Sequence, residues 1–563
     1  MSGIASAPSQ LGLAGKRSYD TVRRMCPAAR FAAIFVLLNT AALSAANEVT
    51  ATRIRAHTTF LADDLLEGRG AGTRGHELAA RYVASQLARL GIEPGADGGI
   101  YEQPVKLVES ASNYAAARLV VRAGDKEDAL TPVNDMMVTI APGQTADAIT
   151  ATAVFVGFGI RAPDLQHDDF AGVDLQGKIA VILSGAPQRF PSEQRAHHGN
   201  SEQKRTLLVQ HGAIGVVTIM TPWDEVRRPW AMTVALSRFP SMRLVDDAGG
   251  LVNGFPQLRV LGSVGNAAAG RVLIGAPKTL SEIFAAAERG EPQNFPLGVT
   301  ITLAGEATLR RVESLNVLGR LPGTDPELAG QPLVITGHLD HLGIGTAVNG
   351  DTIYNGAVDN ALGIGVLLQV AEELATGPRP RRPVLFAAVT GEEKGLLGSH
   401  RLATHPPAWV QRCAASLNID MPLLSAPARD LIAYGYRNST LGAVLEKVAG
   451  RHGMVVSPDP APEEVRFVRS DQYSFVLTGV PAMKVDPGKQ AVDPAVDLVA
   501  AEVDYRKNHY HKPSDELDRP IDWTAAARYT ALMADLARTI ANEPSAPAWL
   551  PGDFFGELFG PKK

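Results

Sequence analysis

Three apolar runs in the second half of the chain each end in side chains that can bind a metal. The runs are residues 333–337 before His338, residues 384–389 before Glu392 and Glu393, and residues 414–419 before Asp420. Each run has the length of a buried strand and alternates with helical patterns, which favours an α/β fold with a largely parallel sheet flanked by helices. Because the carboxyl ends of parallel strands meet at one edge of an open sheet, we expect these side chains to converge on one crevice.

The adjacent acids Glu392 and Glu393 lie among glycines after the second apolar run. On a surface loop such a pair would simply be solvated. Here the strand before them is apolar, so both carboxylates are expected in a partly desolvated crevice, where like charges need a cation nearby. A bound metal ion would supply that cation.

Other metal-binding side chains occur near these runs. His338 is followed closely by Asp340, and Asp359 precedes a helical pattern. Taken singly, Asp359 is equally a helix cap and His338 an ordinary loop histidine. Together with the glutamate pair and Asp420, they favour a metal centre. His511 lies in a polar turn that would, by itself, more often be a surface turn than a ligand.

The first 46 residues have the pattern of an export signal. Basic residues precede the apolar run 31–38, and the small residues Ser44, Ala45 and Ala46 follow it. The run is short for a membrane helix, which needs about 20 apolar residues. We therefore expect cleavage after Ala46 and an exported protein, periplasmic or secreted, with no stable membrane insertion. An uncleaved N-terminal anchor is the alternative.

Charge and cysteine content narrow the possible partners and the sources of stability. The net charge is −5 at pH 7, and the sequence has no basic stripe interleaved with aromatic residues, so nucleic acid is not an expected partner. Cys26 and Cys413 are the only cysteines, and the first lies in the leader, so we expect no intrachain disulfide in the mature chain. The sequence leaves the oligomeric state open.

These segments resemble the zinc exopeptidase family that includes leucyl-type aminopeptidases and glutamate carboxypeptidases. The resemblance begins at residues 66–73 (LEGRGAGT) and extends through the acidic and histidine motifs to residues 511–515 (HKPSD). Residues 150–220 resemble the protease-associated domain inserted in many members. The resemblance implies a zinc-exopeptidase-like mixed, largely parallel sheet flanked by helices, with an inserted β-rich domain.

The resemblance also implies a role for each residue of the motifs. Two zinc ions would be bridged by Asp359, one of them completed by Glu393 and His511 and the other by His338 and Asp420. Asp340 would orient His338, and Glu392 would be the general base. Tyr510 and Arg469 match side chains that stabilise the tetrahedral intermediate in some relatives. Gln472 departs from the family, in which many members have histidine, and this departure concerns substrate fit more than metal binding.

The expected domain organisation follows from the length of the chain, from the change in its secondary-structure patterns and from the family resemblance. A chain of 563 residues exceeds the usual size of one core, and between about 130 and 290 helical patterns give way to short β-rich runs. The expected parts are the signal peptide 1–46, the catalytic domain 47–130 and 291–545, the inserted domain 131–290 and a C-terminal tail 546–563. We expect the insertion to tune access without supplying a catalytic group.

The function implied by the resemblance is hydrolysis of peptides from one end, with an aminopeptidase favoured. The alternatives are a carboxypeptidase of the glutamate carboxypeptidase type, a single-zinc glutaminyl cyclase, and a receptor-like protein without catalysis. A carboxypeptidase needs cations for the terminal carboxylate, whereas an aminopeptidase needs acids or carbonyls for the free amine. Sequence spacing locates neither pocket.

Overall fold

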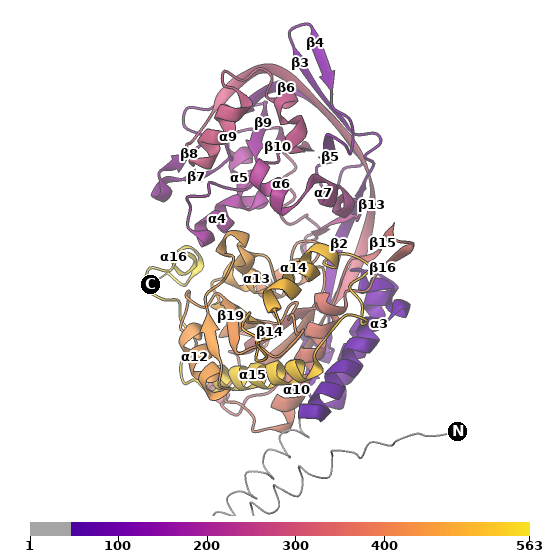
Figure 1. Ribbon diagram of the computed structural model, residues 1–563, viewed down its shortest axis with the longest axis vertical. Helices are drawn as coiled ribbons and strands as arrows, with labels where there is room; N and C mark the ends of the chain where they lie inside the picture. The colour runs from indigo at the N-terminus through magenta and orange to yellow at the C-terminus, as the bar shows by residue number, and fades with distance from the viewer. Residues whose placement is uncertain (1–46, 563) are drawn as a thin grey trace, which may run out of the picture.

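The computed structural model describes residues 47–562, so the predicted signal peptide, residues 1–46, lies outside the described residues. The described chain forms two lobes, one above the other in Figure 1, each with its own apolar core. Within residues 47–562, no helix combines the length and the apolar character needed to cross a membrane.

The lower lobe is built on a mixed sheet. Its strands follow the spatial order β2 (Glu102–Ser112), β13 (Phe295–Leu321), β17 (Val384–Val389), β14 (Leu333–His338), β18 (Ala415–Asn418), β21 (Ala482–Pro487), β19 (Asp430–Tyr434) and β20 (Val455–Ser457). The central strands β17, β14, β18 and β21 run parallel to one another. The predicted α/β fold with a largely parallel sheet is therefore confirmed.

Helices cover both faces of this sheet. One face packs on α3 (Arg74–Arg89), α10 (Leu362–Thr376), α12 (Leu441–Arg451) and α15 (Trp523–Asn542), and the other on α11 (Leu397–Thr404), α13 (Gln472–Val476) and α16 (Phe554–Phe559). Along β14, Leu333 and Ile335 enter the first core, whereas Val334 enters the second. Burial on both faces explains why these strands appear in the sequence as continuous apolar runs.

The upper lobe has a second sheet, whose core draws on residues from Ala117 to Ala307. Its strands follow the order β4 (Lys126–Ala129), β3 (Arg118–Ala123), β13, β6 (Ala146–Phe155), β9 (Ile179–Leu183), β10 (Gly215–Ile219), β12 (Val260–Val264) and β5 (Met136–Ile140). Helices α5 (Ser201–Gln210) and α9 (Leu280–Glu288) pack beside it.

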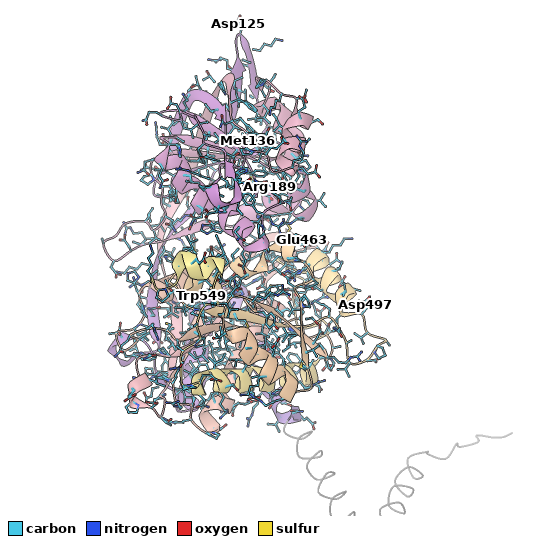
Figure 2. The ribbon with its side chains drawn as sticks, turned by 90° about the vertical axis from the view of Figure 1, so that its left-hand side faces the viewer. Asp125, Met136, Arg189, Glu463, Asp497 and Trp549 are labelled. Atoms are coloured by element: carbon cyan, nitrogen blue, oxygen red, sulfur yellow. The ribbon has the colours of Figure 1, made fainter. Side chains whose placement is uncertain are left out.

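The long strand β13 joins the two lobes. Residues 295–306 pair with β6 in the upper sheet, and residues 307–317 pair with β2 in the lower one. The lobes also meet at Pro462, whose carbonyl accepts hydrogen bonds from Ser192 and Arg195 at the start of α4 (Ser192–Gly199). In Figure 2, the neighbouring Glu463 lies at the junction, below Arg189 of the upper lobe and above Trp549 of the lower lobe.

Candidate metal centre

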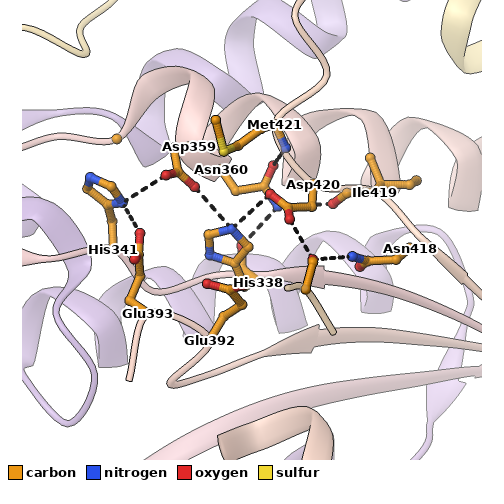
Figure 3. A network of polar contacts seen from close by, with 12 residues as sticks. His338, His341, Asp359, Asn360, Glu392, Glu393, Asn418, Ile419, Asp420 and Met421 are labelled. Carbon is orange, nitrogen blue, oxygen red and sulfur yellow. Dashed lines mark hydrogen bonds and ion pairs between the residues drawn. The ribbon is translucent and has the colours of Figure 1, made fainter. Parts of the chain in front are cut away.

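The lower sheet and the turns after its strands bring all five predicted ligands together (Figure 3 shows four of them). His338 is the last residue of β14, Asp420 follows β18, and Glu393 follows β17. Asp359 lies in the short helical turn η6 (Ala357–Ala361), directly before α10, where the Asp359–Asn360 peptide bond is cis. The convergence predicted for one sheet edge is therefore present in the structure.

The first group of side chains contains His338, Asp359 and Asp420. The Nε2 atom of His338 lies 3.1 Å from Oδ1 of Asp359 and 3.3 Å from Oδ1 of Asp420. All three residues are buried. Asp420 is held from behind by the hydroxyl of Ser470, which donates a hydrogen bond to its other oxygen.

The second group lies around the other oxygen of Asp359. Nε2 of His511 is 3.4 Å from Oδ2 of Asp359 and 3.1 Å from Oε2 of Glu393. Nδ1 of His341 lies 2.7 Å from Oε1 of Glu393. Asp359 thus faces each group with a different oxygen, which is the geometry required of a bridging carboxylate.

These side chains fit divalent metal ions. Ligands about 2.1 Å from a tetrahedral zinc ion lie roughly 3.4 Å apart, close to the separations within each group. The 2.7 Å contact between His341 and Glu393 lacks hydrogen-bond geometry, and both atoms are buried without a hydrogen-bond partner in the described chain. Ligand atoms that point at a shared ion, rather than at each other, explain such a contact.

His341 is a candidate ligand to which the sequence reasoning gave no role. His341, Asp359 and Glu393 place one ligand atom each within 4.8 Å of one another, so the second group offers two histidines where the resemblance implies one. Gly356 makes room for this ring, because a Cβ atom there would lie 2.5 Å from Cγ of His341. The sequence signal for His341 was its position three residues after the predicted ligand His338.

The acids beside the metal ligands have shifted pKa values. Burial raises the pKa of Glu392 well above its ordinary value, and Asp420 and Glu393 raise it further. Burial alone would also raise the pKa of Asp359, but hydrogen bonds with His338 and His511 hold it below its ordinary value. Glu392, the position predicted for the general base, therefore holds a proton more readily than Asp359 does.

Asp340 contacts its neighbours differently from the predicted arrangement. Nδ1 of His338 lies 3.0 Å from the main-chain oxygen of Asp340, whereas the carboxylate of Asp340 accepts a hydrogen bond from the backbone N–H of Glu392 at 3.2 Å. Burial raises the pKa of Asp340 to about 6. The main chain of Asp340 thus orients the imidazole, and its side chain fixes the turn that carries Glu392.

Tyr510 and Arg469 line a cavity of about 450 Å³ that also exposes Glu393 and His511. The Tyr510 ring stacks on His511 with ring centroids 3.7 Å apart. Burial raises the pKa of the Tyr510 phenol, so its hydroxyl keeps its proton and can donate a hydrogen bond. Both predicted intermediate-stabilising residues therefore lie beside the metal-binding side chains.

Two buried residues behind the ligands were not predicted to support the site. The carboxylate of Asp515 accepts hydrogen bonds from the N–H groups of Val358 and Asp359, both at 3.1 Å, and from the Tyr505 hydroxyl at 3.0 Å. Gln472 accepts a hydrogen bond at 2.9 Å from Asn418, which also donates to Ser470 behind Asp420. Gln472 thus lies in the network that holds Asp420.

Comparison with known proteins locates the family in this part of the chain. Residues 316–537 match the model of peptidase family M28. The chain is 32% identical over 108 residues to a vacuolar membrane protease of Candida tropicalis, covering 19% of this chain and 10% of that protein. It is 45% identical over 209 residues to a probable zinc metalloprotease of Pyrenophora teres f. teres, covering 34% of this chain and 42% of that protein.

Aminopeptidase NAALADL1 of Rattus norvegicus is 32% identical over 139 residues, covering 23% of this chain and 17% of that protein. The chain therefore spans less than half the length of each of these curated relatives. Among solved structures, the aminopeptidase from Aneurinibacillus sp. strain AM-1 superposes with a TM-score of 0.52 at 19% identity, covering 88% of this chain and 95% of that one, and so shares its fold. The metal-binding strands and turns all lie inside the matched residues 316–537, and this part of the chain is similar to peptidase family M28.

Proposed function

We propose that this protein is an exported aminopeptidase that hydrolyses N-terminal residues from peptides with two zinc ions per chain. The observation that carries the proposal is Asp359, whose two oxygens face two separate groups of metal-binding side chains. The similarity of residues 316–537 to peptidase family M28 supports a peptidase reaction. Nδ1 of His341 and Oε1 of Glu393 are buried and have no hydrogen-bond partner within residues 47–562. Such atoms are costly unless a metal satisfies them, which favours a metal enzyme over a receptor-like role.

The first zinc ion would be held by His338, Asp359 and Asp420, and the second by Asp359, Glu393 and His511, with His341 as an additional ligand. When bound, zinc lowers the pKa of a water molecule and polarises the scissile carbonyl. Glu392 would accept the proton of the attacking water and return it to the leaving amine. Tyr510, whose phenol keeps its proton, would donate a hydrogen bond to the developing oxyanion.

A carboxypeptidase is the second candidate, because a specific observation favours it. Arg228, Lys394 and Arg469 line the cavity beside the metal-binding side chains, and cations of this kind can bind a terminal carboxylate.

The direction of attack is tested with leucine-initiated peptides that carry a C-terminal amide and either a free or an acetylated amine. The zinc-loaded enzyme should release leucine from the free peptide alone, and a chelator should abolish release. Release of the C-terminal residue from an acetylated peptide with a free C-terminal carboxylate would instead support the carboxypeptidase.

Export is a separate part of the proposal and rests on residues 1–46. The full chain, expressed with its leader in a bacterium, should be recovered from the periplasm or medium with a new N-terminus at Asn47. Recovery in the membrane fraction with the leader intact would support the uncleaved anchor.

A further inference from the structure

A second cavity, of about 480 Å³, adjoins the cavity beside the metal centre. The two cavities share the wall residues Arg228, Met232, Arg469 and Tyr510. The first also exposes Glu393 and His511, so the shared wall connects the metal-binding side chains with the second cavity. A peptide bound at the metal centre therefore has a continuous path along this wall.

The second cavity is strongly cationic. It is lined by five arginines, against the two carboxylates of Asp224 and Glu464; these arginines are Arg227, Arg228, Arg466, Arg469 and Arg506. Most of them have acidic partners. Arg466 and Arg506 lie 2.8 Å and 2.7 Å from the same oxygen of Glu502.

Arg469 and Arg228 are the least neutralised of the five. Arg469 lies 3.4 Å from Glu464, a carboxylate that it shares with Arg227. The Arg228 side chain forms no hydrogen bond or ion pair with any residue in 47–562, and it is exposed within the cleft. Arg228 and Arg469 line the walls of both cavities, and partial loss of water around Arg228, followed by the positive charge of Arg469, lowers the pKa of Arg228.

We propose that Arg228 and Arg469 form an anion-binding subsite that takes a carboxylate of the peptide substrate. An anion between them would relieve their repulsion, and a guanidinium group binds a carboxylate through two parallel hydrogen bonds. The inference rests on the proposed function and defines its substrate class as peptides with a carboxylate near the scissile bond. That carboxylate is either the C-terminus of a short peptide or an acidic side chain.

Through Arg228, the subsite also gives the upper lobe a direct role in substrate binding. Arg228 lies between α6 (Pro222–Arg227) and α7 (Trp230–Ser237), on the side of the upper lobe that faces the lower one (Figure 1). Arg469 belongs to the lower lobe and precedes the buried Ser470, which binds Asp420. The substrate carboxylate would therefore contact both lobes at once.

The experiment compares two pairs of peptides on the zinc-loaded full chain. The first pair is Leu-Ala-Ala with a free or an amidated C-terminus, and the second is amidated Leu-Glu-Ala against amidated Leu-Gln-Ala. The readout is the ratio of kcat/KM within each pair, measured as leucine released. Wild-type enzyme should prefer the carboxylate member of at least one pair by about 10- to 100-fold, as expected for hydrogen bonds to a charged group.

Arg228→Gln should bring that ratio close to one, and Arg228→Lys should retain part of it because the charge remains. Arg122→Gln is the matched control, since Arg122 pairs with Glu127 on an exposed hairpin and should leave the ratio as in the wild type. The pair that responds identifies the source of the carboxylate. Equal ratios in wild type and Arg228→Gln for both pairs would overturn the inference. No leucine release from any peptide would overturn the proposed function itself.

Discussion

Neighbouring acids in this site have different surroundings despite identical chemistry. Oε2 of Glu393 lies 3.1 Å from Nε2 of His511, so this carboxylate is part of a ligand group. The Glu392 carboxylate forms no hydrogen bond or ion pair with any residue from 47 to 562, and burial raises its pKa well above the ordinary value. The surroundings of each residue, rather than its type, therefore distinguish a base from a ligand.

Substitution of these two glutamates should separate their roles. Glu392→Gln keeps the shape of the side chain but cannot accept a proton, so turnover should fall by about 100- to 10,000-fold while both zinc ions stay bound. Glu393→Gln weakens a metal ligand, so zinc content should fall first and excess zinc should restore part of the activity. Metal analysis beside steady-state kinetics measures both effects. Equal zinc loss in the two variants would contradict the assignment of the base.

His341 should contribute to zinc affinity. Its Nδ1 atom lies 2.7 Å from Glu393 without hydrogen-bond geometry, as expected if both atoms point at an ion. His341→Asn should weaken binding of one zinc ion by at least about 10-fold, a loss typical of perturbed metal ligation, and leave the other ion in place. Chelator competition measures both affinities, with His405→Asn, at a half-exposed histidine, as the control. Unchanged affinity in His341→Asn would restrict the second group to three ligands.

The five ligand candidates were predictable because each stands at the end of an apolar strand or in a motif of the resembling family. His341 lies three residues after His338, which is a local signal, but its contact with Glu393 joins segments that are 52 residues apart, and no local pattern reports that contact. The place of Arg228 in the cavity wall was not predicted for the same reason, because this residue reaches the cavity from the other lobe. Local sequence therefore predicts which side chains lie at the end of a strand, but not which distant residues contact them in the folded chain.

At the scale of elements, the turn η6 controls where Asp359 points. Asp515 accepts hydrogen bonds from two of its N–H groups, and Gly356 precedes it with a φ of 59°, a conformation that L-residues other than glycine rarely adopt. A Cβ atom at Gly356 would lie 2.2 Å from the carbonyl oxygen of Asp359. The strands could be predicted from their continuous apolar runs, whereas this turn depends on contacts with Asp515 from the far end of the chain.

Gly356→Ala should therefore damage the metal centre as well as stability. Backbone strain alone costs about 1–3 kcal/mol, and the clash with Asp359 should also displace the bridging carboxylate and lower zinc content. Gly453→Ala is the matched control, because its φ is 66° and a Cβ atom there meets nothing within 4 Å. The control should lose stability without losing zinc. Denaturant unfolding and metal analysis of both variants test this, and full zinc occupancy in Gly356→Ala would contradict the role given to the turn.

At the scale of the whole molecule, two cores share the strand β13, and the cavity beside the metal centre is lined by both lobes. The stability of the lower core is linked to pH through buried histidines. Burial lowers the pKa of His57 to about 4 and that of His76 to about 3. Both side chains are thus neutral in the folded protein at pH values where the unfolded chain binds a proton.

In the zinc-free protein, these two histidines should consequently contribute a loss of stability as the pH falls from about 6.5 toward 4. The unfolded chain takes up protons near pH 6.5, whereas folded His57 does not until about pH 4, so each such histidine costs about 1.4 kcal/mol per pH unit in this window. Between pH 6.5 and 5 the loss should be about 2 kcal/mol for His57 alone. Urea unfolding of the zinc-free protein at both pH values measures it without interference from metal release.

His57→Gln should remove this share of the pH dependence, because glutamine does not titrate, although the contact of His57 with the Tyr82 hydroxyl at 2.8 Å is also lost at every pH. The decisive quantity is therefore the difference in unfolding free energy between pH 6.5 and 5, not the stability at either pH. That difference should shrink by about 2 kcal/mol in His57→Gln and stay as in the wild type in His405→Gln, whose side chain is 47% exposed. An unchanged difference in His57→Gln would mean that folded His57 accepts its proton as readily as the unfolded chain does, and the acid sensitivity would then belong to other groups.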